Sequence, residues 1–190
     1  MITGPSGVGK GTLIRSLIAR VPELELSVSA TTRRPRLGET HGVDYHFLDE
    51  DEFDRRVRDG EFVEHASYSG RRYGTLLSDL EQRLARGVPV VLEIEVQGAR
   101  QVRETMPEAE RIFIAPPSEE ALRARLIGRG TDSPEDVEKR LETAREELRA
   151  QKEFPHVVRN DRLEDAVTAL EELVRTALES EGTNSTEEPS

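Results

Sequence analysis

The sequence contains no cysteine and no tryptophan, and phenylalanine and tyrosine together make up only 4% of its 190 residues. The absence of cysteine excludes disulfide bonds, thiolate catalysis and cysteine-ligated zinc. No apolar run approaches the roughly 18 residues that a membrane-spanning helix needs, and the chain does not begin with a cationic and then apolar signal segment. We therefore expect a cytoplasmic protein with one hydrophobic core and no membrane partner.

Positive charge is also scarce, because 27 basic residues face 38 acidic ones and leave a formal net charge of −11. Broad nucleic-acid binding needs clustered basic surface, so this balance argues against nucleic acid as a partner. Only three of the basic residues are lysines: Lys10, Lys139 and Lys152. The first of them lies in a glycine-rich loop, where phosphate binding calls for a lysine.

That loop covers residues 4–12: Gly4, Pro5, Ser6, Gly7, Val8, Gly9, Lys10, Gly11 and Thr12. Glycines can adopt positive φ, so successive backbone N–H groups can point at one anion. Lys10 adds a mobile ammonium that can follow the β- and γ-phosphates of a nucleotide. The alternative is a glycine-rich turn with an incidental lysine, because this short pattern also arises by chance.

The sequence that follows the loop supports phosphate binding, whereas the sequence that precedes it does not. Apolar residues at helical spacing predict a helix over 11–20, whose positive end would face the same phosphates. Before the loop, however, only residues 1–3 are available, whereas an interior strand usually has about five or six residues. Either the chain starts late or its first strand is unusually short.

Strands and helices alternate along the rest of the chain. Apolar runs predict strands at 26–30, 88–94, 111–115 and 156–159, and helical periodicity predicts helices at 76–86, 118–127 and 163–178. This alternation is typical of an α/β fold, with a parallel sheet core and helices on both faces. We assign this core to residues 1–31, 76–127 and 143–178.

Two insertions and a tail interrupt the core. Residues 32–75 contain glycines, prolines, a helix candidate at 50–58 and strand-like segments at 45–48 and 62–68, which predict a small α+β lobe. Residues 128–142 predict a short lid, in which a new helix starts at Ser133 and Pro134. Residues 179–190 carry four acidic residues and no basic ones, and we expect them to be a disordered acidic tail.

Seven motifs, taken together and in order, are specific. With the loop, they are residues 27–36 with the arginines Arg33, Arg34 and Arg36, Gly42 to Tyr45, Glu61 to Glu64, Tyr73 to Thr75, Glu93 to Gly98, and Gly128 to Thr131. With these motifs the chain resembles guanylate kinases, which belong to the nucleoside monophosphate kinase group of P-loop kinases. The resemblance covers nearly the whole chain, from Gly4 to about Leu178.

The resemblance implies transfer of the γ-phosphoryl group of Mg-ATP to GMP, and also to dGMP, giving ADP and the diphosphate. It assigns ATP to residues 4–12 together with Arg125 and Asn160. It assigns catalytic roles to Lys10, Arg36, Arg129 and Arg140. Because the acceptor oxygen is already anionic, positioning and electrostatics carry the catalysis and no strong general base is needed.

For GMP, the resemblance implies a phosphate site made of Arg33, Arg36, Tyr45 and Tyr73. Arginine forks suit a phosphate group, and we assign the third tyrosine, Tyr68, to packing. Guanine shows N1–H and N2–H donors beside the O6 acceptor, and the resemblance places Glu64, Ser29 and Thr75 against them. Glu93 and Glu95 stand where the family often has aspartates, so their roles in guanine contact or in orienting metal-bound water stay open.

The metal is the main departure from the general pattern. Many phosphate-binding loops follow the lysine with a serine or threonine that ligates Mg²⁺, whereas here Gly11 follows it. We therefore expect Mg²⁺ to be held through phosphates and water, and we assign no residue as a metal ligand. The histidines have no metal spacing, and we expect structural or surface roles for them: His41, His46, His65 and His156.

Two alternatives remain at this point. One is a non-catalytic, guanylate-kinase-like module that binds proteins, although such modules typically lack a complete phosphate loop. The other is a related kinase with another acceptor, such as AMP or a phosphorylated ribose. We expect ATP and GMP as the small-molecule partners, and a monomer or a weak homo-oligomer.

Overall fold

The computed structural model describes residues 1–68, 70–128 and 134–184. Internal contacts divide the chain into two compact units. The first, called here the pocket unit, comprises Met1 and residues 24–109, and the second, the loop unit, comprises residues 2–23 and the described residues from 110 on. No described helix combines the length and the apolar composition needed to cross a membrane.

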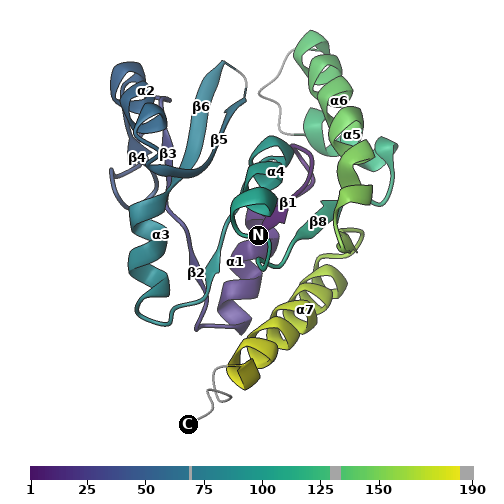
Figure 1. Ribbon diagram of the computed structural model, residues 1–190. Coiled ribbons are helices and arrows are strands. Elements are labelled where there is room, and N and C mark those ends of the chain that lie inside the picture. Colours follow the sequence, from purple (N-terminus) through teal and green to yellow (C-terminus); the bar gives the residue numbers. More distant parts are fainter. Residues whose placement is uncertain (69, 129–133, 185–190) are drawn as a thin grey trace. The chain divides into compact units, whose positions relative to one another are not determined.

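The loop unit is built on a parallel three-stranded sheet in the order β1 (Ile2–Thr3), β8 (Ile112–Ala115) and β9 (His156–Arg159). The described helices of this unit are α1 (Lys10–Arg20), α5 (Glu119–Ile127), α6 (Pro134–Arg149), the 3₁₀ turn η1 (Ala150–Glu153) and α7 (Leu163–Asn184) (Figure 1). The short β1 pairs Ile2 with Ile112 on β8. This pairing holds the start of the glycine-rich loop at the carboxyl edge of the sheet.

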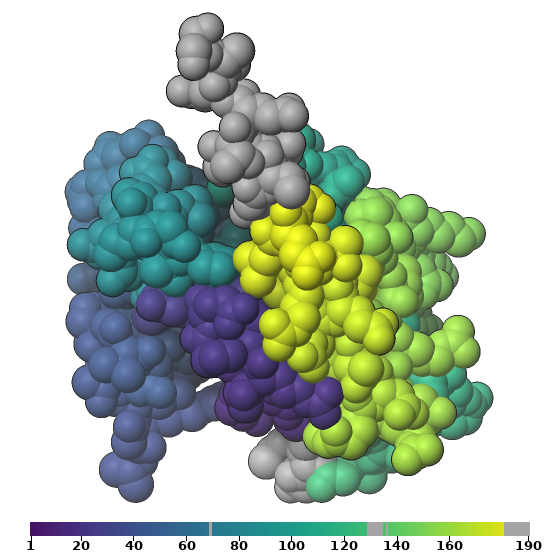
Figure 2. All heavy atoms as spheres, turned by 90° about the horizontal axis from the view of Figure 1, so that it is seen from below, coloured from purple at the N-terminus to yellow at the C-terminus, as the bar shows by residue number. Residues whose placement is uncertain are grey.

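Apolar faces of the helices form the core of the loop unit. On α1, the residues Leu13, Ile14 and Leu17 are fully buried, as the helical spacing predicts. Figure 2 shows α7 lying against α1, and Arg20 on α1 forms an ion pair with Glu171 on α7. The helix that opens at the glycine-rich loop is therefore fixed by packing along its length.

The pocket unit contains two sheets. The larger one has four strands in the order β4 (His46–Phe47), β3 (Ser29–Thr31), β6 (Arg71–Leu76) and β5 (Phe62–Tyr68), and the smaller one pairs β2 (Glu25–Leu26) with β7 (Val90–Val91) in parallel. The helices are α2 (Glu50–Arg58), α3 (Leu77–Leu84) and α4 (Val96–Thr105). In the larger sheet, β6 is antiparallel to both neighbours, and β5 lies at the edge.

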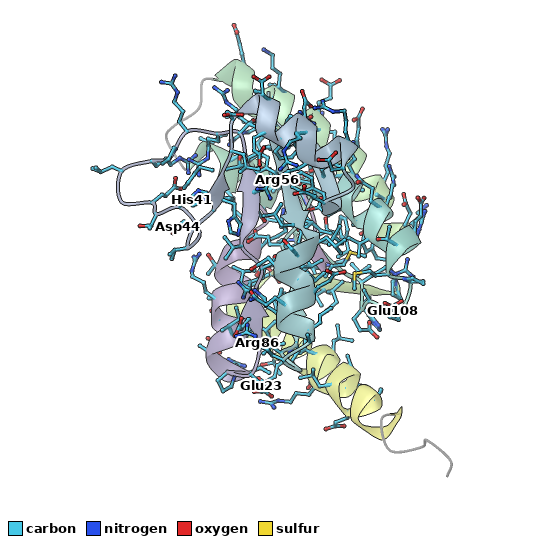
Figure 3. All side chains as sticks on the ribbon, turned by 60° about the vertical axis from the view of Figure 1, so that its left-hand side comes forward. Glu23, His41, Asp44, Arg56, Arg86 and Glu108 are labelled. Atoms are coloured by element: carbon cyan, nitrogen blue, oxygen red, sulfur yellow. The ribbon has the colours of Figure 1, made fainter. Side chains whose placement is uncertain are left out.

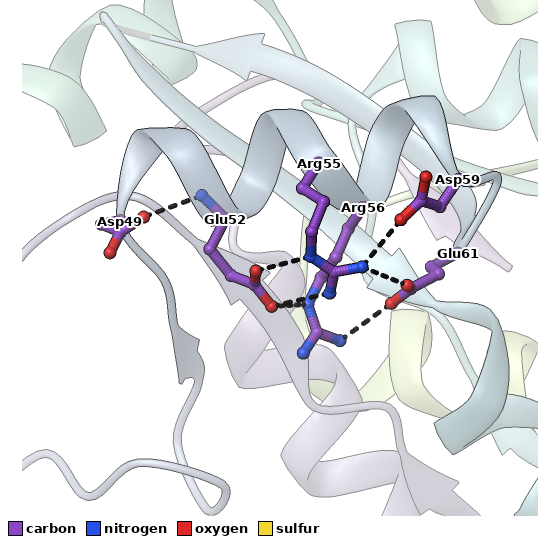
Figure 4. Close-up of polar contacts among 6 residues, drawn as sticks. All are labelled: Asp49, Glu52, Arg55, Arg56, Asp59 and Glu61. Atoms are coloured by element: carbon purple, nitrogen blue, oxygen red, sulfur yellow. Dashed lines mark hydrogen bonds and ion pairs between the residues drawn. The ribbon is translucent and has the colours of Figure 1, made fainter.

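Helix α2 shows how polar residues define an element of the pocket unit (Figure 4). The Asp49 side chain accepts a hydrogen bond from the Glu52 N–H and thereby caps the start of the helix. Along the exposed face, Arg55 pairs with Glu52, Asp59 and Glu61. The opposite face buries Phe53, whose ring stacks on Phe62 at 4.5 Å between centroids, and thereby anchors α2 on the sheet.

Most of the predicted elements are present, and the helix at 50–58 and the strands at 62–68 and 156–159 have the expected bounds. The strand expected over 26–30 is wrong as one element, because the chain leaves β2 and enters β3 of the other sheet. Of the strand expected over 88–94, only the Val90–Val91 pair forms a ladder. Helix α7 continues through the start of the expected tail to Asn184, and residues 185–190 lie outside the described residues.

Candidate nucleotide-binding sites

In the glycine-rich loop, the backbone conformation or the close packing leaves no room for a side chain at several glycine positions. Gly9 has a φ of 98° at the start of α1, a conformation that favours glycine. A Cβ atom at Gly4 would lie 2.3 Å from the Ile114 carbonyl oxygen, and one at Gly7 would lie 2.7 Å from a Leu126 methyl group. Two of the loop glycines are thus required by close packing against β8 and α5.

Lys10 lies inside this loop and is buried. Its ammonium donates hydrogen bonds to the carbonyl oxygens of Gly4, at 2.5 Å, and Pro5, at 3.5 Å. The ammonium is therefore held by the backbone of the same loop whose N–H groups are predicted to bind phosphate. A flexible side chain in this position can exchange carbonyl acceptors for phosphate oxygens.

The side chains of Arg125 and Asn160 both contact the loop, and both donate a hydrogen bond to the same carbonyl oxygen. Arg125 Nη1 donates to the Val8 carbonyl oxygen at 3.1 Å, and Asn160 Nδ2 donates to the same oxygen at 2.8 Å. Arg125 Nη2 also donates to the Asn160 carbonyl oxygen at 2.8 Å, and the Asn160 N–H donates to Ala115 at the end of β8. These contacts brace the tip of the loop against the strand β8 and the helix α5.

The remaining residues expected near ATP are less informative. Thr12 lies on the first turn of α1, where its hydroxyl accepts a hydrogen bond from Arg15 at 3.3 Å. Arg140 lies on α6 and is partly exposed. Arg129 lies outside the described residues, so its expected place near the transferring phosphoryl group stays a prediction.

The pocket unit contains a cavity of about 280 Å³ with many polar side chains on its walls. Its lining includes most of the residues expected to bind GMP: Ser29, Tyr45, Glu64, Tyr73, Glu93 and Glu95. Strand pairing brings the expected base-binding residues together, since Ser29 on β3 lies opposite Thr75 on β6, and Thr75 lies opposite Glu64 on β5. These three positions form one row across three strands.

Glu64 is the chemically distinctive member of that row. It is 4% exposed, and its Oε1 accepts a hydrogen bond from the Thr75 hydroxyl at 2.8 Å. Burial raises the pKa of Glu64 to about 7; hydrogen bonds from Thr75 lower it, and the Glu95 charge raises it further. The carboxyl group of Glu64 therefore titrates near neutral pH and not in the acidic range of an exposed glutamate.

Glu93 and Glu95 follow β7 and line the same cavity. Glu95 is the residue that precedes the first turn of α4, and its buried Oε2 has no hydrogen-bond partner among the described residues. The buried hydroxyl of Ser27 is likewise without a partner among them. A ligand or water that entered the cavity would find unsatisfied polar atoms in this wall.

The arginine-rich segment supplies one ordered guanidinium. Arg33 Nη1 and Nη2 donate to the two carboxylate oxygens of Glu39 at 2.9 and 2.8 Å, and the guanidinium carbon lies 5.2 Å from the centre of the Tyr45 ring. The Glu39 carboxylate also accepts the backbone N–H of Arg36 at 2.7 Å, whereas the Arg36 side chain is exposed. The pKa of Glu39 is lowered by its hydrogen bonds with Arg33.

Both predicted tyrosines stand beside this arginine. The Tyr45 and Tyr73 rings are 6.3 Å apart in an edge-to-face arrangement, and burial raises the pKa of Tyr45.

Figure 3 shows His41 and Asp44 on the loop that leads into β4. Within the described part of the chain, no group of three or more side chains has the arrangement of a metal site.

Comparison with known proteins decides the family. A family model described as guanylate kinase matches residues 1–177. This chain belongs to the guanylate kinase family. A guanylate kinase of Frankia casuarinae is 53% identical over 174 residues, which cover 92% of this chain and 95% of the relative. One of Thermobifida fusca is 52% identical and covers 92% of this chain and 89% of the relative.

A solved structure agrees with these relatives. The crystal structure of guanylate kinase from Anaplasma phagocytophilum matches with a TM-score of 0.74 and 33% identity, over 93% of this chain and 84% of that one. Membership of the guanylate kinase family confirms the expected P-loop kinase fold and the expected ATP:GMP phosphotransferase activity. It does not favour the non-catalytic module.

Three residues at or near this guanylate kinase's cavity were not predicted as site residues: Ser27 and Tyr68, which line it, and Glu39, which pairs with Arg33. Ser27 lies two residues before Ser29, so strand-like alternation around 27–29 was a usable signal for both. Glu39 follows Arg36 by three residues, but nothing in the sequence shows that it pairs with Arg33. Tyr68, which we expected to serve only in packing, also lines the cavity.

Proposed function

We propose that this guanylate kinase binds ATP on the glycine-rich loop and GMP in the cavity of the pocket unit. The observation that carries the proposal is the row of Ser29, Thr75 and Glu64 across β3, β6 and β5. The row brings one buried carboxylate and two hydroxyl groups together at a cavity of about 280 Å³, whose wall includes Ser29 and Glu64, while the buried Thr75 donates to Glu64 from behind. Such a set matches the donors and acceptor of a guanine edge.

Base selection follows from hydrogen-bond polarity. Guanine offers two donors, N1–H and N2–H, to an ionised Glu64, whereas adenine has an acceptor at N1 and would leave the buried carboxylate unpaired. The Thr75 hydroxyl occupies one carboxylate oxygen and fixes the plane of the group. An unpaired buried charge is costly, so the site discriminates against AMP as well as attracting GMP.

The acceptor phosphate would be held by Arg33 with the hydroxyl groups of Tyr45 and Tyr73. Glu39 engages the Nη1 and Nη2 atoms of Arg33 and keeps the guanidinium in place against the Tyr45 ring. Arg36, whose side chain is exposed, would add a second guanidinium once the phosphate is present. Charge-assisted hydrogen bonds from arginine forks suit this dianionic group.

On the ATP side, Lys10 would leave the loop carbonyls for the β- and γ-phosphates and follow the transferred group. Arg125 and Asn160 would act on ATP through the loop that they brace, and Arg129 and Arg140 would stabilise the charge that develops during transfer. The acceptor oxygen is already anionic, so these residues work by positioning and electrostatics.

Mg²⁺ supplies charge neutralisation on the phosphates when it enters with ATP. The loop offers it little direct ligation, because Gly11 has no side chain and the Thr12 hydroxyl already contacts Arg15. We therefore propose that phosphate oxygens and water hold the ion, and we assign no residue to it. dGMP is proposed as a second acceptor.

Substitution of Glu64 tests the guanine site. We expect Glu64→Gln to lower kcat/KM for GMP by about 100-fold or more, with a change in the KM for ATP of less than about twofold. Glu61→Gln is the matched control, because Glu61 lies in the same segment but pairs with arginines of α2 on the surface. Steady-state kinetics with each substrate varied measures both; full GMP activity in Glu64→Gln would refute the assignment.

A further inference from the structure

Helix α4 lies along β5, the edge strand that carries Glu64. Its Gln101 side chain pairs with the backbone of the next residue: Oε1 accepts from the His65 N–H at 3.1 Å, and Nε2 donates to the His65 carbonyl oxygen at 2.7 Å. The amide thus takes the place that a neighbouring strand would have. The register between α4 and β5 is fixed one residue away from the guanine-binding carboxylate.

Gly98 lies three residues earlier on α4 and touches the carboxylate itself. A Cβ atom at Gly98 would lie 2.1 Å from Glu64 Oε2 and 2.9 Å from Glu64 Cδ. The backbone of Gly98 does not need positive φ, and within a helix glycine is less favourable than alanine by up to roughly 1 kcal/mol. Space for Glu64, rather than backbone conformation, therefore explains a glycine at this position.

The carboxylate has little freedom to avoid a larger residue. Its Oε1 is bonded to the Thr75 hydroxyl, and Glu64 is 4% exposed. A methyl group at position 98 would push on the end of a side chain and not on the backbone of β5. The carboxylate would then move away from Thr75 while the fold persists.

We infer that Gly98 and Gln101 are positioning residues that set where α4 holds the Glu64 carboxylate, and so determine the affinity for the guanine base. This inference rests on the proposed role of Glu64 in guanine binding. Gly98 acts by leaving room for Oε2, and Gln101 acts by fixing β5 against α4. Neither needs to touch the substrate.

The test is Gly98→Ala, with Gln97→Ala as the matched control. Both changes place alanine in α4, but Gln97 is exposed. We expect Gly98→Ala to fold with at most a small fall in melting temperature, because the buried hydrogen bond from Thr75 is weakened, to keep its KM for ATP, and to raise the KM for GMP by about tenfold, a split that mere loss of stability would not give. Gln97→Ala is expected to leave both KM values unchanged.

A second pair of variants checks the cause. In a Glu64→Asp background, which withdraws the carboxylate by one methylene, Gly98→Ala is expected to change the KM for GMP by less than about threefold, because the clash is gone. Gln101→Ala is expected to raise the KM for GMP several-fold at unchanged KM for ATP, since it releases the edge of β5.

The outcomes separate this inference from the proposed function. A folded Gly98→Ala protein with native KM for GMP would overturn the inference, and if Glu64→Gln were still impaired, the guanine site would stand. A Gly98→Ala protein that does not fold would also overturn it, because the side-chain end of Glu64 is expected to yield. If Glu64→Gln and Gly98→Ala both kept native kinetics, the guanine site itself would be wrong.

Discussion

At the scale of the residue, burial has two opposing effects on the Glu64 carboxyl group. Burial makes the carboxylate a strong, specific acceptor, and the same burial raises its pKa to about 7. The proposed guanine site therefore couples GMP binding at neutral pH to the release of a proton from Glu64. The ionised form prevails above pH 7, and the protonated form, which lacks one acceptor position, prevails below it.

This titration predicts a pH dependence for GMP. Because the folded-state pKa is about 7, the ionised fraction falls about tenfold between pH 8 and pH 6, so the KM for GMP is expected to rise about tenfold over that range. The GMP phosphate also titrates near pH 6, and the Glu64→Gln variant isolates that contribution. Equal pH profiles of the KM for GMP in native and Glu64→Gln enzymes would contradict the account.

The sequence names candidate site residues, but it does not predict how they are arranged. Glu64, Ser29 and Thr75 were predicted through the family resemblance, but the row that they form depends on the register between β3, β6 and β5. The pairing of Arg33 with Glu39 depends on how a loop folds back on itself. Side-chain pairings of this kind follow from tertiary structure and leave no periodic signal.

At the scale of elements, the amphipathic helices were predictable and the transitions between sheets were not. The apolar residues at 26–30 indicate a strand, yet the pattern does not show that the chain changes sheets near Val28. Helix α4 was not predicted, because it is short and has few apolar residues. A glycine inside it, Gly98, further weakens the helical pattern.

The hydrogen bonds of Asn160 and Arg125 to the Val8 carbonyl oxygen predict that residues outside the glycine-rich loop affect ATP binding through it. Asn160→Ala removes the 2.8 Å hydrogen bond to the Val8 carbonyl oxygen and leaves the one from Arg125 in place. We expect the KM for ATP to rise about three- to tenfold, because one buried hydrogen bond is lost, with the KM for GMP unchanged. Asp161→Ala, at an exposed neighbouring position, serves as the control; a native KM for ATP in Asn160→Ala would exclude the brace.

At the scale of the whole molecule, each compact unit contains the residues of one candidate nucleotide site. The contacts of Lys10, Arg125 and Asn160 lie within the loop unit, and the cavity is lined by the pocket unit alone. The unit that contains the cavity also contains β2, β7, α3 and α4. The narrower lobe expected at 32–75 and the lid expected at 128–142 stay predictions.

The division predicts that phosphoryl transfer and GMP binding can be separated. Lys10→Ala is expected to lower kcat by about 100-fold or more, because it removes the cation that follows the transferred group, while the equilibrium Kd for GMP changes by less than about twofold. Titration calorimetry with GMP measures the second quantity. A large loss of GMP affinity in a folded Lys10→Ala protein would mean that the two sites are not built separately.

We propose that the cavity around Glu64 selects guanine over other bases. The most direct measurement is ADP formation from ATP with a panel of acceptors at equal concentration: GMP, dGMP, AMP, UMP and CMP. We expect rapid turnover with GMP and dGMP, and rates lower by about 100-fold or more with the other three. Equal turnover of AMP and GMP would contradict it.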